Sequence, residues 1–366
     1  MADVLVIGCG LIGASIGLAL RESDRDVCLY DQSPAVVGEA VRRGAGRPWE
    51  HEEPALLAVV AVPPRATASA LIGAQGRKVA RTYTHVSSVQ AQVQREVETL
   101  SPDSSVVVGG HPLAGRELSG PGAATADLFA GRPWAVCATP GNAPEALADV
   151  ESLVGDCGAD LVHLTAAAHD AAVAVLSHLP QITASALAAA LLEAGPVTDD
   201  PDRIRLAGPG LVDTTRLAAS DAELWSQIIE LNAAEIAPVV AGLAHRLMAT
   251  AEALSALAAP ASGPGQAAAI LALRGLLRDG NVGRALVPVK RGARSEAFAP
   301  VRISVRDEPG RLAALLTDAG GLGFNVEDVH VEHLPGRPTG VIELLVAARE
   351  VEGVASGLAA RGWAVV

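Results

Sequence analysis

The 366-residue sequence predicts an α/β doubly wound parallel sheet, then an all-helical domain, then a small ferredoxin-like βαββαβ domain. Over residues 1–165, short β-branched segments alternate with Ala-rich helical stretches, a pattern typical of a parallel sheet wound with helices. Over residues 166–287, long Ala- and Leu-rich helical stretches replace the strands. Residues 301–366 show strand, helix, two strands, helix and strand in that order. Residues 288–300 between them are basic and contain Pro and Gly, which predicts a linker.

Local residue patterns predict the bounds of the individual elements. In the first domain, strands are expected at Val4–Ile7, Val27–Tyr30, Val59–Val62, Val106–Val108 and Trp134–Cys137. In the helical domain, breaks are expected at Gly195–Pro196 and Gly208–Gly210. In the last domain, strands are expected at Val301–Arg306, Val326–Glu332, Val341–Ala347 and Trp363–Val366, helices at Arg311–Ala319 and Val354–Ala360, and a turn at Leu334–Gly336.

Composition and charge exclude several classes of protein. Hydrophobic residues make up 50% of the chain and charged residues 19%, which excludes a disordered chain. A formal net charge of −13 repels nucleic acid and anionic membranes, and an aromatic content of 2% leaves no stacking surface for RNA. We therefore expect neither nucleic acid nor a membrane as a partner.

Two further features bear on the location of the protein. The uncharged stretch 171–192 is long enough to span a bilayer, but it is mostly Ala and contains His178 and Pro180. We therefore expect a helix buried in a helical or dimeric core. The four cysteines are widely spaced, with no C-x-x-C pair and no histidine at metal-ligand spacing. Reduced core cysteines, no metal site and a cytoplasmic protein are expected.

A glycine-rich loop near the N-terminus predicts a dinucleotide site. Gly8, Gly10 and Gly13 fit G-x-G-x-x-G directly after the first strand and at the start of a helix. Gly8 allows the tight turn, Gly10 leaves room for a pyrophosphate, and Gly13 lets the helix lie close to the strand. The helix start, with Leu11 and Ile12, offers free N–H groups and the positive end of the helix dipole to the phosphates. These features predict a Rossmann-type domain.

Asp31 and His111 predict the cofactor and the chemistry of this domain. Asp31 ends the second strand, where a carboxylate can accept hydrogen bonds from both ribose hydroxyls and repels a 2′-phosphate, so the expected cofactor is NAD. His111 follows the strand Val106–Val108, which places it at a carboxyl end beside the cofactor crevice. A neutral imidazole there, with a pKa near its ordinary value of about 6.5, is a candidate general base.

The residues around His111 carry a resemblance to a known family. The stretch 109–121, Ser177-His178-Leu179-Pro180 and Asp213-Thr214-Thr215-Arg216 are similar to the prephenate/arogenate dehydrogenase family of tyrosine biosynthesis, over about residues 1–290. The tail from about Val301 resembles an ACT domain, an amino-acid-sensing module. The resemblance implies NAD-dependent oxidative decarboxylation of prephenate to 4-hydroxyphenylpyruvate. It also implies a homodimer formed through the helical domain.

The resemblance assigns catalytic roles to two residues. His111 matches the histidine that accepts the proton of the substrate's ring hydroxyl, and Ser88 matches the serine that hydrogen-bonds this hydroxyl and the histidine. An N-cap of the following helix is the alternative role for Ser88. The family usually has Asp at the position of His85 and Lys at the position of Gln90, so the local charges differ here.

The resemblance also implies substrate contacts in the helical domain. Arg216 matches the arginine that pairs with a substrate carboxylate, with an ion pair to Asp213 as the alternative. His178 matches a family histidine, although a structural role within the core is equally expected. Gln181 stands where relatives often have a second histidine, and Glu117 matches an acidic residue at the pocket mouth. The pair His169-Asp170 matches a His-Asp pair at the start of the helix that contains His178.

The tail resembles an effector site. Asp307 and Gly310 match the loop between the first strand and first helix of an ACT domain, and Asn325 matches a residue that often faces this loop across a subunit boundary. A helix N-terminus at Gly310 can receive an α-carboxylate and Asp307 an ammonium group, which points to tyrosine or phenylalanine as effector. A dimerisation module without an effector is the alternative.

Two other functions remain open from the sequence. Arogenate as substrate would give tyrosine directly and differs from prephenate only by an amino in place of a keto group. A catalytically degenerate amino-acid sensor is consistent with His85, Gln90 and Gln181. A β-hydroxyacid dehydrogenase is disfavoured, because residues 166–250 contain no lysine to serve as its catalytic group.

Overall fold

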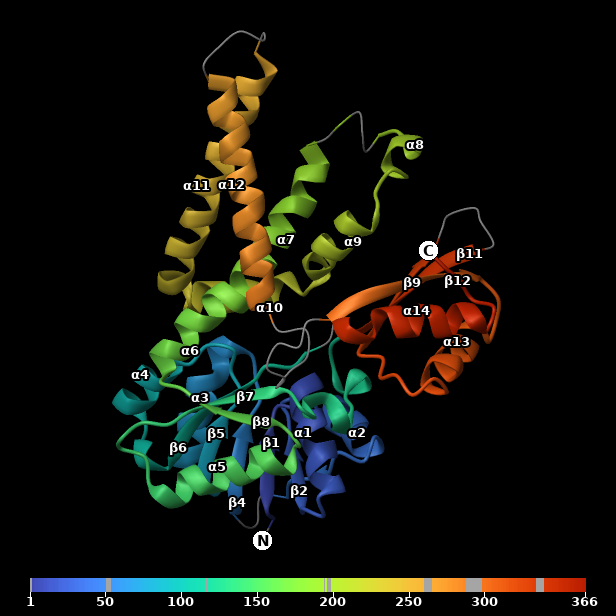
Figure 1. Cartoon of the computed structure of the whole chain (residues 1–366). Coiled ribbons are helices and arrows are strands. Elements are labelled where there is room, and N and C mark those ends of the chain that lie inside the picture. The colour runs from blue at the N-terminus through green and yellow to red at the C-terminus, as the bar shows by residue number, and fades with distance from the viewer. Residues whose placement is uncertain are drawn as a thin grey trace. The chain divides into compact units, whose positions relative to one another are not determined.

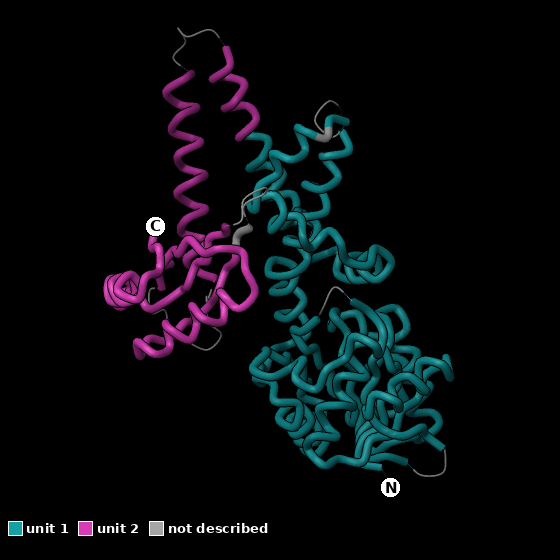
Figure 2. Tube along the Cα trace, turned by 90° about the vertical axis from the view of Figure 1, so that its right-hand side faces the viewer, with its two compact units in different colours: residues 1–249 teal, residues 250–366 magenta. Residues whose placement is uncertain are grey.

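The computed structural model describes residues 2–50, 54–115, 118–193, 195, 199–259, 265–287, 298–333 and 339–366 (Figure 1). The chain divides into two compact units, residues 1–249 and 250–366 (Figure 2). The first unit contains the α/β sheet and most of the helical segment. The second contains the end of a long helix, a further helix and the C-terminal sheet.

The first unit is built on an eight-stranded sheet with the order β3-β2-β1-β4-β5-β6-β7-β8. All neighbouring strands are parallel except β6 and β7, which are antiparallel. The predicted doubly wound sheet is confirmed, and the reversal at β7 is an addition to it. The strands are β1 (Val4–Ile7), β2 (Val27–Tyr30), β3 (Arg47–Pro48), β4 (Ala55–Val60), β5 (Ala80–His85), β6 (Val107–Pro112), β7 (Pro133–Cys137) and β8 (Asp160–His163).

Helices cover both faces of this sheet. Consecutive residues of β1 belong to different clusters of buried residues: Val4 and Val6 to one, Leu5 and Ile7 to the other. A strand with apolar side chains on both faces requires a helical layer on each side. All four cysteines are unpaired and buried, as expected. The helices of this part are α1 (Leu11–Glu22), α2 (Pro34–Arg42), α3 (Pro64–Gly76), α4 (Ala91–Leu100) and α5 (Pro144–Asp156).

The helical segment continues the chain within the first unit. Gly208 is the N-cap of α9 and Pro209 its first residue, which confirms the break expected there; Pro196 lies outside the described residues. A π-helical turn, η4, separates α6 from α7. The elements are α6 (Ala166–Val173), η4 (Ala174–His178), α7 (Leu179–Ala190), η5 (Leu191–Glu193), α8 (Pro201–Ile204), α9 (Pro209–Thr215), the 3-10 turn η7 (Arg216–Ala219), α10 (Ala222–Leu231) and α11 (Ala233–Ala258), whose last turns belong to the second unit.

The helical run Ala166–Glu193 is long and apolar enough to cross a membrane, and only 17% of its most apolar window is buried within the chain. The burial expected for this stretch is therefore not reached inside one copy of the chain. Leu176, Leu187 and Leu192 are all exposed on it.

The second unit ends in a four-stranded antiparallel sheet with the order β10-β11-β9-β12. Its element order confirms the predicted βαββαβ domain. The first strand begins three residues before the expected Val301, and most of the predicted linker, like the turn 334–336, lies outside the described residues. The elements are α12 (Gly265–Leu286), β9 (Phe298–Arg306), α13 (Arg311–Gly320), β10 (Asp328–His333), β11 (Thr339–Ala347), α14 (Val351–Ala360) and β12 (Ala364–Val365).

Candidate active site

The glycine loop between β1 and α1 has the shape that a pyrophosphate requires. A Cβ on Gly13 would lie 1.9 Å from the carbonyl oxygen of Gly8, so only glycine allows this close contact between helix and loop. A Cβ on Gly10 would meet nothing within 4 Å, so the space beside Gly10 is open. Gly10 is the N-cap of α1, and no side chain caps the helix. The first amides of α1 are therefore available to an anion.

Asp31 lies against this loop at the end of β2. Its Oδ2 accepts a hydrogen bond from the Cys9 N–H at 2.9 Å, and its Oδ1 accepts one from the Ser33 N–H at 2.9 Å. These two bonds fix the carboxylate beside the turn while leaving each oxygen a further lone pair. The carboxylate is thus placed where ribose hydroxyls of a bound dinucleotide would meet it.

The glycine loop and His111 lie at the same edge of the sheet. Strands β1, β4, β5 and β6 are consecutive neighbours and all parallel, so their carboxyl ends meet at one edge. Three inter-strand spacings, about 14 Å, separate the end of β1 from the end of β6. His111 is the second-to-last residue of β6 and is partly exposed. This edge is where ligands bind in open α/β sheets.

His111 is the first member of a hydrogen-bonded chain of three side chains. Its Nδ1 lies 2.9 Å from Nε2 of His169, and Nδ1 of His169 lies 2.8 Å from Oδ1 of Asp170. Backbone N–H groups of Gln90 and Ala91 donate to the two oxygens of Asp170, at 2.9 and 2.8 Å. Asp170 therefore also holds the start of α4 through its carboxylate.

The hydrogen-bonded chain His111–His169–Asp170 determines which nitrogen of each ring carries a proton when Asp170 is ionised. Asp170 accepts, so Nδ1 of His169 must donate, and a neutral His169 then has an accepting Nε2. His111 must in turn donate through its Nδ1. Its remaining nitrogen, Nε2, has no hydrogen-bond partner among the described residues and keeps its lone pair. The arrangement makes Nε2 the basic atom of His111.

Burial keeps three histidines of this region neutral. Burial, followed by the neighbouring His169, His178 and His85, holds the pKa of His111 well below its ordinary value. Burial likewise lowers the pKa of His85 to about 3 and that of His178 to about 4. An unshifted pKa for His111 was expected from the sequence, and the structure corrects it downward.

Ser88 lies in the loop after β5, at the sheet edge that also carries His111. His85 is paired with Gly109 of β6, so Ser88, three residues on, follows the strand adjacent to that of His111. The alternative role of helix cap is wrong, because α4 begins at Ala91 and Asp170 binds its first amides. Among the described residues the Ser88 side chain has no hydrogen-bond partner.

His178 and Gln181 lie one helical turn apart where η4 passes into α7. His178 is buried, and its Nδ1 lies 3.2 Å from the amide nitrogen of Asn232, which also donates to the Asp170 carbonyl at 2.9 Å. Since Nδ1 accepts, a neutral His178 carries its proton on Nε2. Gln181 is buried as well, and its amide nitrogen donates to the Leu217 carbonyl at 2.9 Å.

Arg216 stands next to that carbonyl, at the start of η7, and is exposed. Gln181 therefore contacts the turn that carries Arg216. Hydrogen bonds join His111, His169 and Asp170, and Asn232 links His178 to them. Gln181 and the turn η7 that begins at Arg216 form a second group. Glu117 lies outside the described residues.

The predicted effector residues belong to the second unit. Gly310 has φ +84° and is the N-cap of α13, without a side-chain cap. Asp307 is exposed in the preceding loop, and Asn325 donates to Glu327. No group of three or more His, Cys, Asp or Glu among the described residues is arranged to hold a metal ion.

Sequence reasoning left His169 and Asp170 without a role, although they complete the hydrogen-bonded chain. The only local signal was a His-Asp pair at the start of a helix. Their contact with His111, 58 residues away, exists only in the folded chain.

A Rossmann-type loop, an acidic residue after the second strand and a histidine at the same sheet edge define an NAD-dependent dehydrogenase. Comparisons with known proteins name the family. The nucleotide-binding domain of prephenate dehydrogenase matches residues 16–163, and its dimerization domain matches residues 165–260. The chain belongs to the prephenate dehydrogenase family, which confirms the expected activity and cofactor.

Individual relatives agree with this assignment. The chain is 38% identical to the Probable prephenate dehydrogenase NovF of Streptomyces niveus, over 99% of both chains. It shares its fold, with a TM-score of 0.66 and 24% identity over 78% of this chain and 98% of the other, with prephenate dehydrogenase from A. aeolicus, solved with hydroxyphenyl propionate and NAD+. It is also similar to Synechocystis arogenate dehydrogenase, with a TM-score of 0.60 and 25% identity over 77% and 98%.

Proposed function

We propose that this chain converts prephenate to 4-hydroxyphenylpyruvate, with Nε2 of His111 as the general base. The hydrogen-bonded chain His111–His169–Asp170 at the cofactor edge of the sheet is the observation that carries the proposal. The glycine loop and Asp31 would hold NAD, which supplies the hydride acceptor. The open space at Gly10 and the uncapped start of α1 fit its pyrophosphate.

The reaction needs a base that also returns its proton. His111 takes the proton of the C4 hydroxyl as hydride leaves C4, which gives a carbonyl at C4. The bond from C1 to its carboxylate then breaks, CO2 leaves, and the electron pair makes the ring aromatic with a phenolate at C4. His111 returns the proton to that oxygen. The overall reaction consumes no proton, so the same nitrogen acts as base and then as acid.

The histidine chain stabilises the intermediate state in which the proton sits on the enzyme. When Nε2 of His111 is protonated, its Nδ1 proton can move toward His169, which brings positive charge next to Asp170. This contact offsets the effect of burial, which disfavours a charged His111. His169 and Asp170 are therefore positioning residues for the base.

Substrate binding involves the second group of residues and Ser88. Arg216 pairs with a substrate carboxylate, because a guanidinium matches the planar geometry of a carboxylate. Gln181 acts on the substrate indirectly in this proposal, because its bond to the Leu217 carbonyl supports the turn that carries Arg216. Ser88 and the Nε2–H of His178 donate to substrate oxygens, and Glu117 lies at the pocket mouth.

A comparison of two substrates tests the proposal. Purified protein is mixed with NAD and either prephenate or arogenate, NADH formation is followed, and the product is identified by mass spectrometry. We expect a higher kcat/KM with prephenate and 4-hydroxyphenylpyruvate as product. A higher kcat/KM with arogenate and tyrosine as product would favour the second candidate, which the similarity to Synechocystis arogenate dehydrogenase supports. If no NADH forms with either substrate, the remaining candidate is a catalytically degenerate amino-acid sensor.

We also propose a cytoplasmic homodimer formed through the helical segment. The matched dimerization domain covers residues 165–260. The leucines of the run Ala166–Glu193 are exposed in a single copy of the chain, and contact with a second copy would bury them. The C-terminal domain, in this proposal, is an ACT-like regulatory domain that binds tyrosine or phenylalanine at the start of α13. The left-handed Gly310 and the uncapped helix start support an α-carboxylate site there.

A further inference from the structure

Gln90 contacts three separate parts of the active site. Its backbone N–H donates to Asp170 at 2.9 Å. Its side-chain nitrogen donates to the carbonyl of Ser87 at 2.7 Å and to the carbonyl of Gly110 at 2.9 Å. Ser87 precedes Ser88, and Gly110 precedes His111. One residue thus links the carboxylate of the histidine chain to the two strand ends that carry the base and the serine.

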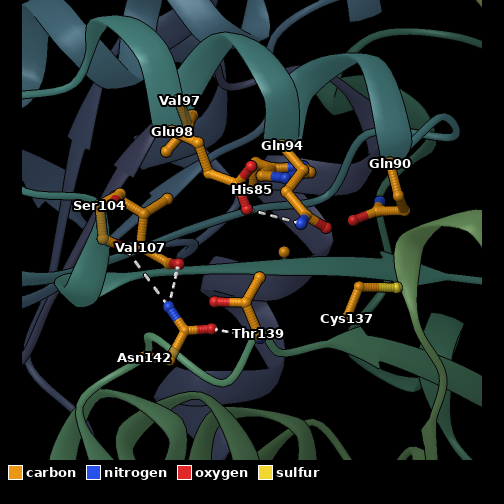
Figure 3. A pocket seen from close by; sticks show the side chains of 11 residues that line it. His85, Gln90, Gln94, Val97, Glu98, Ser104, Val107, Cys137, Thr139 and Asn142 are labelled. Atoms are coloured by element: carbon orange, nitrogen blue, oxygen red, sulfur yellow. Dashed lines mark hydrogen bonds between the residues drawn. The ribbon is translucent and has the colours of Figure 1, made fainter.

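These contacts fix the orientation of the Gln90 amide. Two carbonyl oxygens require the NH2 group on their side, so a flipped amide would place three oxygens together. The amide oxygen, Oε1, must then point the other way. It is buried, and no described residue hydrogen-bonds to it. It faces a small cavity of about 30 Å³ between α4, β6 and β7, which Figure 3 shows.

His85 borders the same space with a hydrogen-bond donor. Its Nδ1 accepts from the Ser87 N–H at 3.3 Å, so the neutral ring carries its proton on Nε2. A Cβ placed on Gly109 would lie 2.5 Å from Oε1 of Gln90 and 3.2 Å from Nε2 of His85. An acceptor and a donor therefore face one cavity that is large enough for a water molecule.

We propose that Gln90 is a positioning residue for His111, and that a water molecule bridges its Oε1 and the Nε2–H of His85. The inference rests on the proposed role of His111 as base. In this arrangement Gln90 holds Gly110, and hence His111, at a fixed distance from the Ser88 loop and from Asp170. Gln90 and His85 are both uncharged, so they fix the base without placing a charge beside it.

Replacement of the side chain separates positioning from structural support. In Gln90→Met the two bonds to carbonyls are lost while the backbone bond to Asp170 remains. We expect kcat with prephenate to fall by roughly ten- to a hundredfold, because a displaced base loses its alignment. KM and NAD affinity stay near wild-type values. Gln94→Met is the matched control: Gln94 lines the same cavity one turn further along α4 but bonds to Glu98, so its kcat stays at the wild-type level.

A donor with a positive charge gives a second readout. Lysine at this position can donate to both carbonyls, so Gln90→Lys should recover most of the kcat lost in Gln90→Met. Its charge disfavours a protonated His111, so the acid limb of the pH–rate profile should move to lower pH. A purely structural role would lower Tm in both variants, and kcat would not recover in Gln90→Lys.

Gly109→Ala tests the same contact from β6, because the added Cβ would lie against Oε1 of Gln90. Its Cβ would displace the water and press on Oε1 of Gln90, so we expect a loss of kcat like that of Gln90→Met. A crystal structure at high resolution should show the bridging water. The proposal is overturned if Gln90→Met and Gly109→Ala keep the wild-type kcat and pH profile, or if the cavity is dry. Absence of activity in the wild-type protein would instead refute the proposed function.

Discussion

At the scale of single residues, the chemistry of the site depends on which oxygen and nitrogen atoms the backbone already occupies. Two backbone amides and His169 bind the Asp170 carboxylate, and this fixes the donor direction along the histidine chain. The same rule applies to Asp31, whose two backbone bonds orient its remaining lone pairs. The active atoms are therefore those without a partner in the described part of the chain, above all Nε2 of His111.

Asp31 should determine the choice of cofactor. We expect the wild-type enzyme to prefer NAD, and Asp31→Ser to narrow the ratio of kcat/KM for NAD over NADP, because the repulsion of a 2′-phosphate is lost. Steady-state rates with both cofactors measure this ratio. Wild-type turnover with NADP that equals turnover with NAD would contradict the assignment.

Arg216 should act mainly on substrate affinity. The ion pair between Arg216 and a substrate carboxylate exists already when the substrate is bound. Arg216→Ala should therefore raise KM for prephenate, with a smaller change in kcat. The loss of binding free energy should be at most a few kcal/mol. A large loss of kcat at unchanged KM would show instead that Arg216 stabilises the transition state.

At the scale of elements, the sequence was most informative where one short segment contains the whole signal. The glycine loop and the order of the C-terminal domain could be predicted because each lies in contiguous residues with a clear pattern. Strand β5 was missed because Arg81, Thr82 and Thr84 are polar. In the fold, Thr82 donates to Asp149 and Thr84 to the Val108 carbonyl, so these side chains are buried with partners. Local polarity does not reveal such partners.

The π-helical turn before α7 has a local cause that the sequence contains but that is easily overlooked. Pro180 has no N–H to donate to the residue four positions earlier, and its ring crowds that carbonyl. The helix therefore widens over Ala174–His178 and places His178 at its end. The contact between His111 and His169, in contrast, arises from the packing of α6 against the sheet edge, which no local pattern predicts.

The C-terminal domain should respond to an amino acid independently of catalysis. Calorimetry on the full chain should detect binding of tyrosine or phenylalanine, and Asp307→Ala should weaken it without a change in basal kcat, because the ammonium partner is lost. A chain that ends at residue 297, before β9, should keep its dehydrogenase activity, and tyrosine or phenylalanine should no longer change that activity. No heat of binding with either amino acid would leave dimerisation as the role of the domain.

At the scale of the whole molecule, the cluster of buried neutral histidines makes the first unit sensitive to acid. The unfolded chain binds protons at histidine near pH 6.5, whereas the pKa is lowered to about 3 for His85 and about 4 for His178 in the folded chain. Between these values the unfolded state holds more protons, so the free energy of unfolding decreases as pH falls.

Denaturant unfolding from pH 7 to pH 4 should show this loss. The free energy of unfolding should fall by about 1.4 kcal/mol per pH unit for each such histidine, beginning near pH 6.5. His85→Gln removes one of these groups and should reduce the slope. A free energy of unfolding that stays constant from pH 6.5 to pH 5 would contradict the buried neutral state.

The most direct test of the account is the rate of NADH formation from prephenate by His111→Asn. Asparagine keeps a hydrogen-bonding side chain but cannot take up the proton. We predict that kcat falls by about two to four powers of ten while NAD affinity, measured by fluorescence titration, remains unchanged. A His111→Asn enzyme with near wild-type kcat would show that another group is the base and would refute the role given to the chain His111–His169–Asp170.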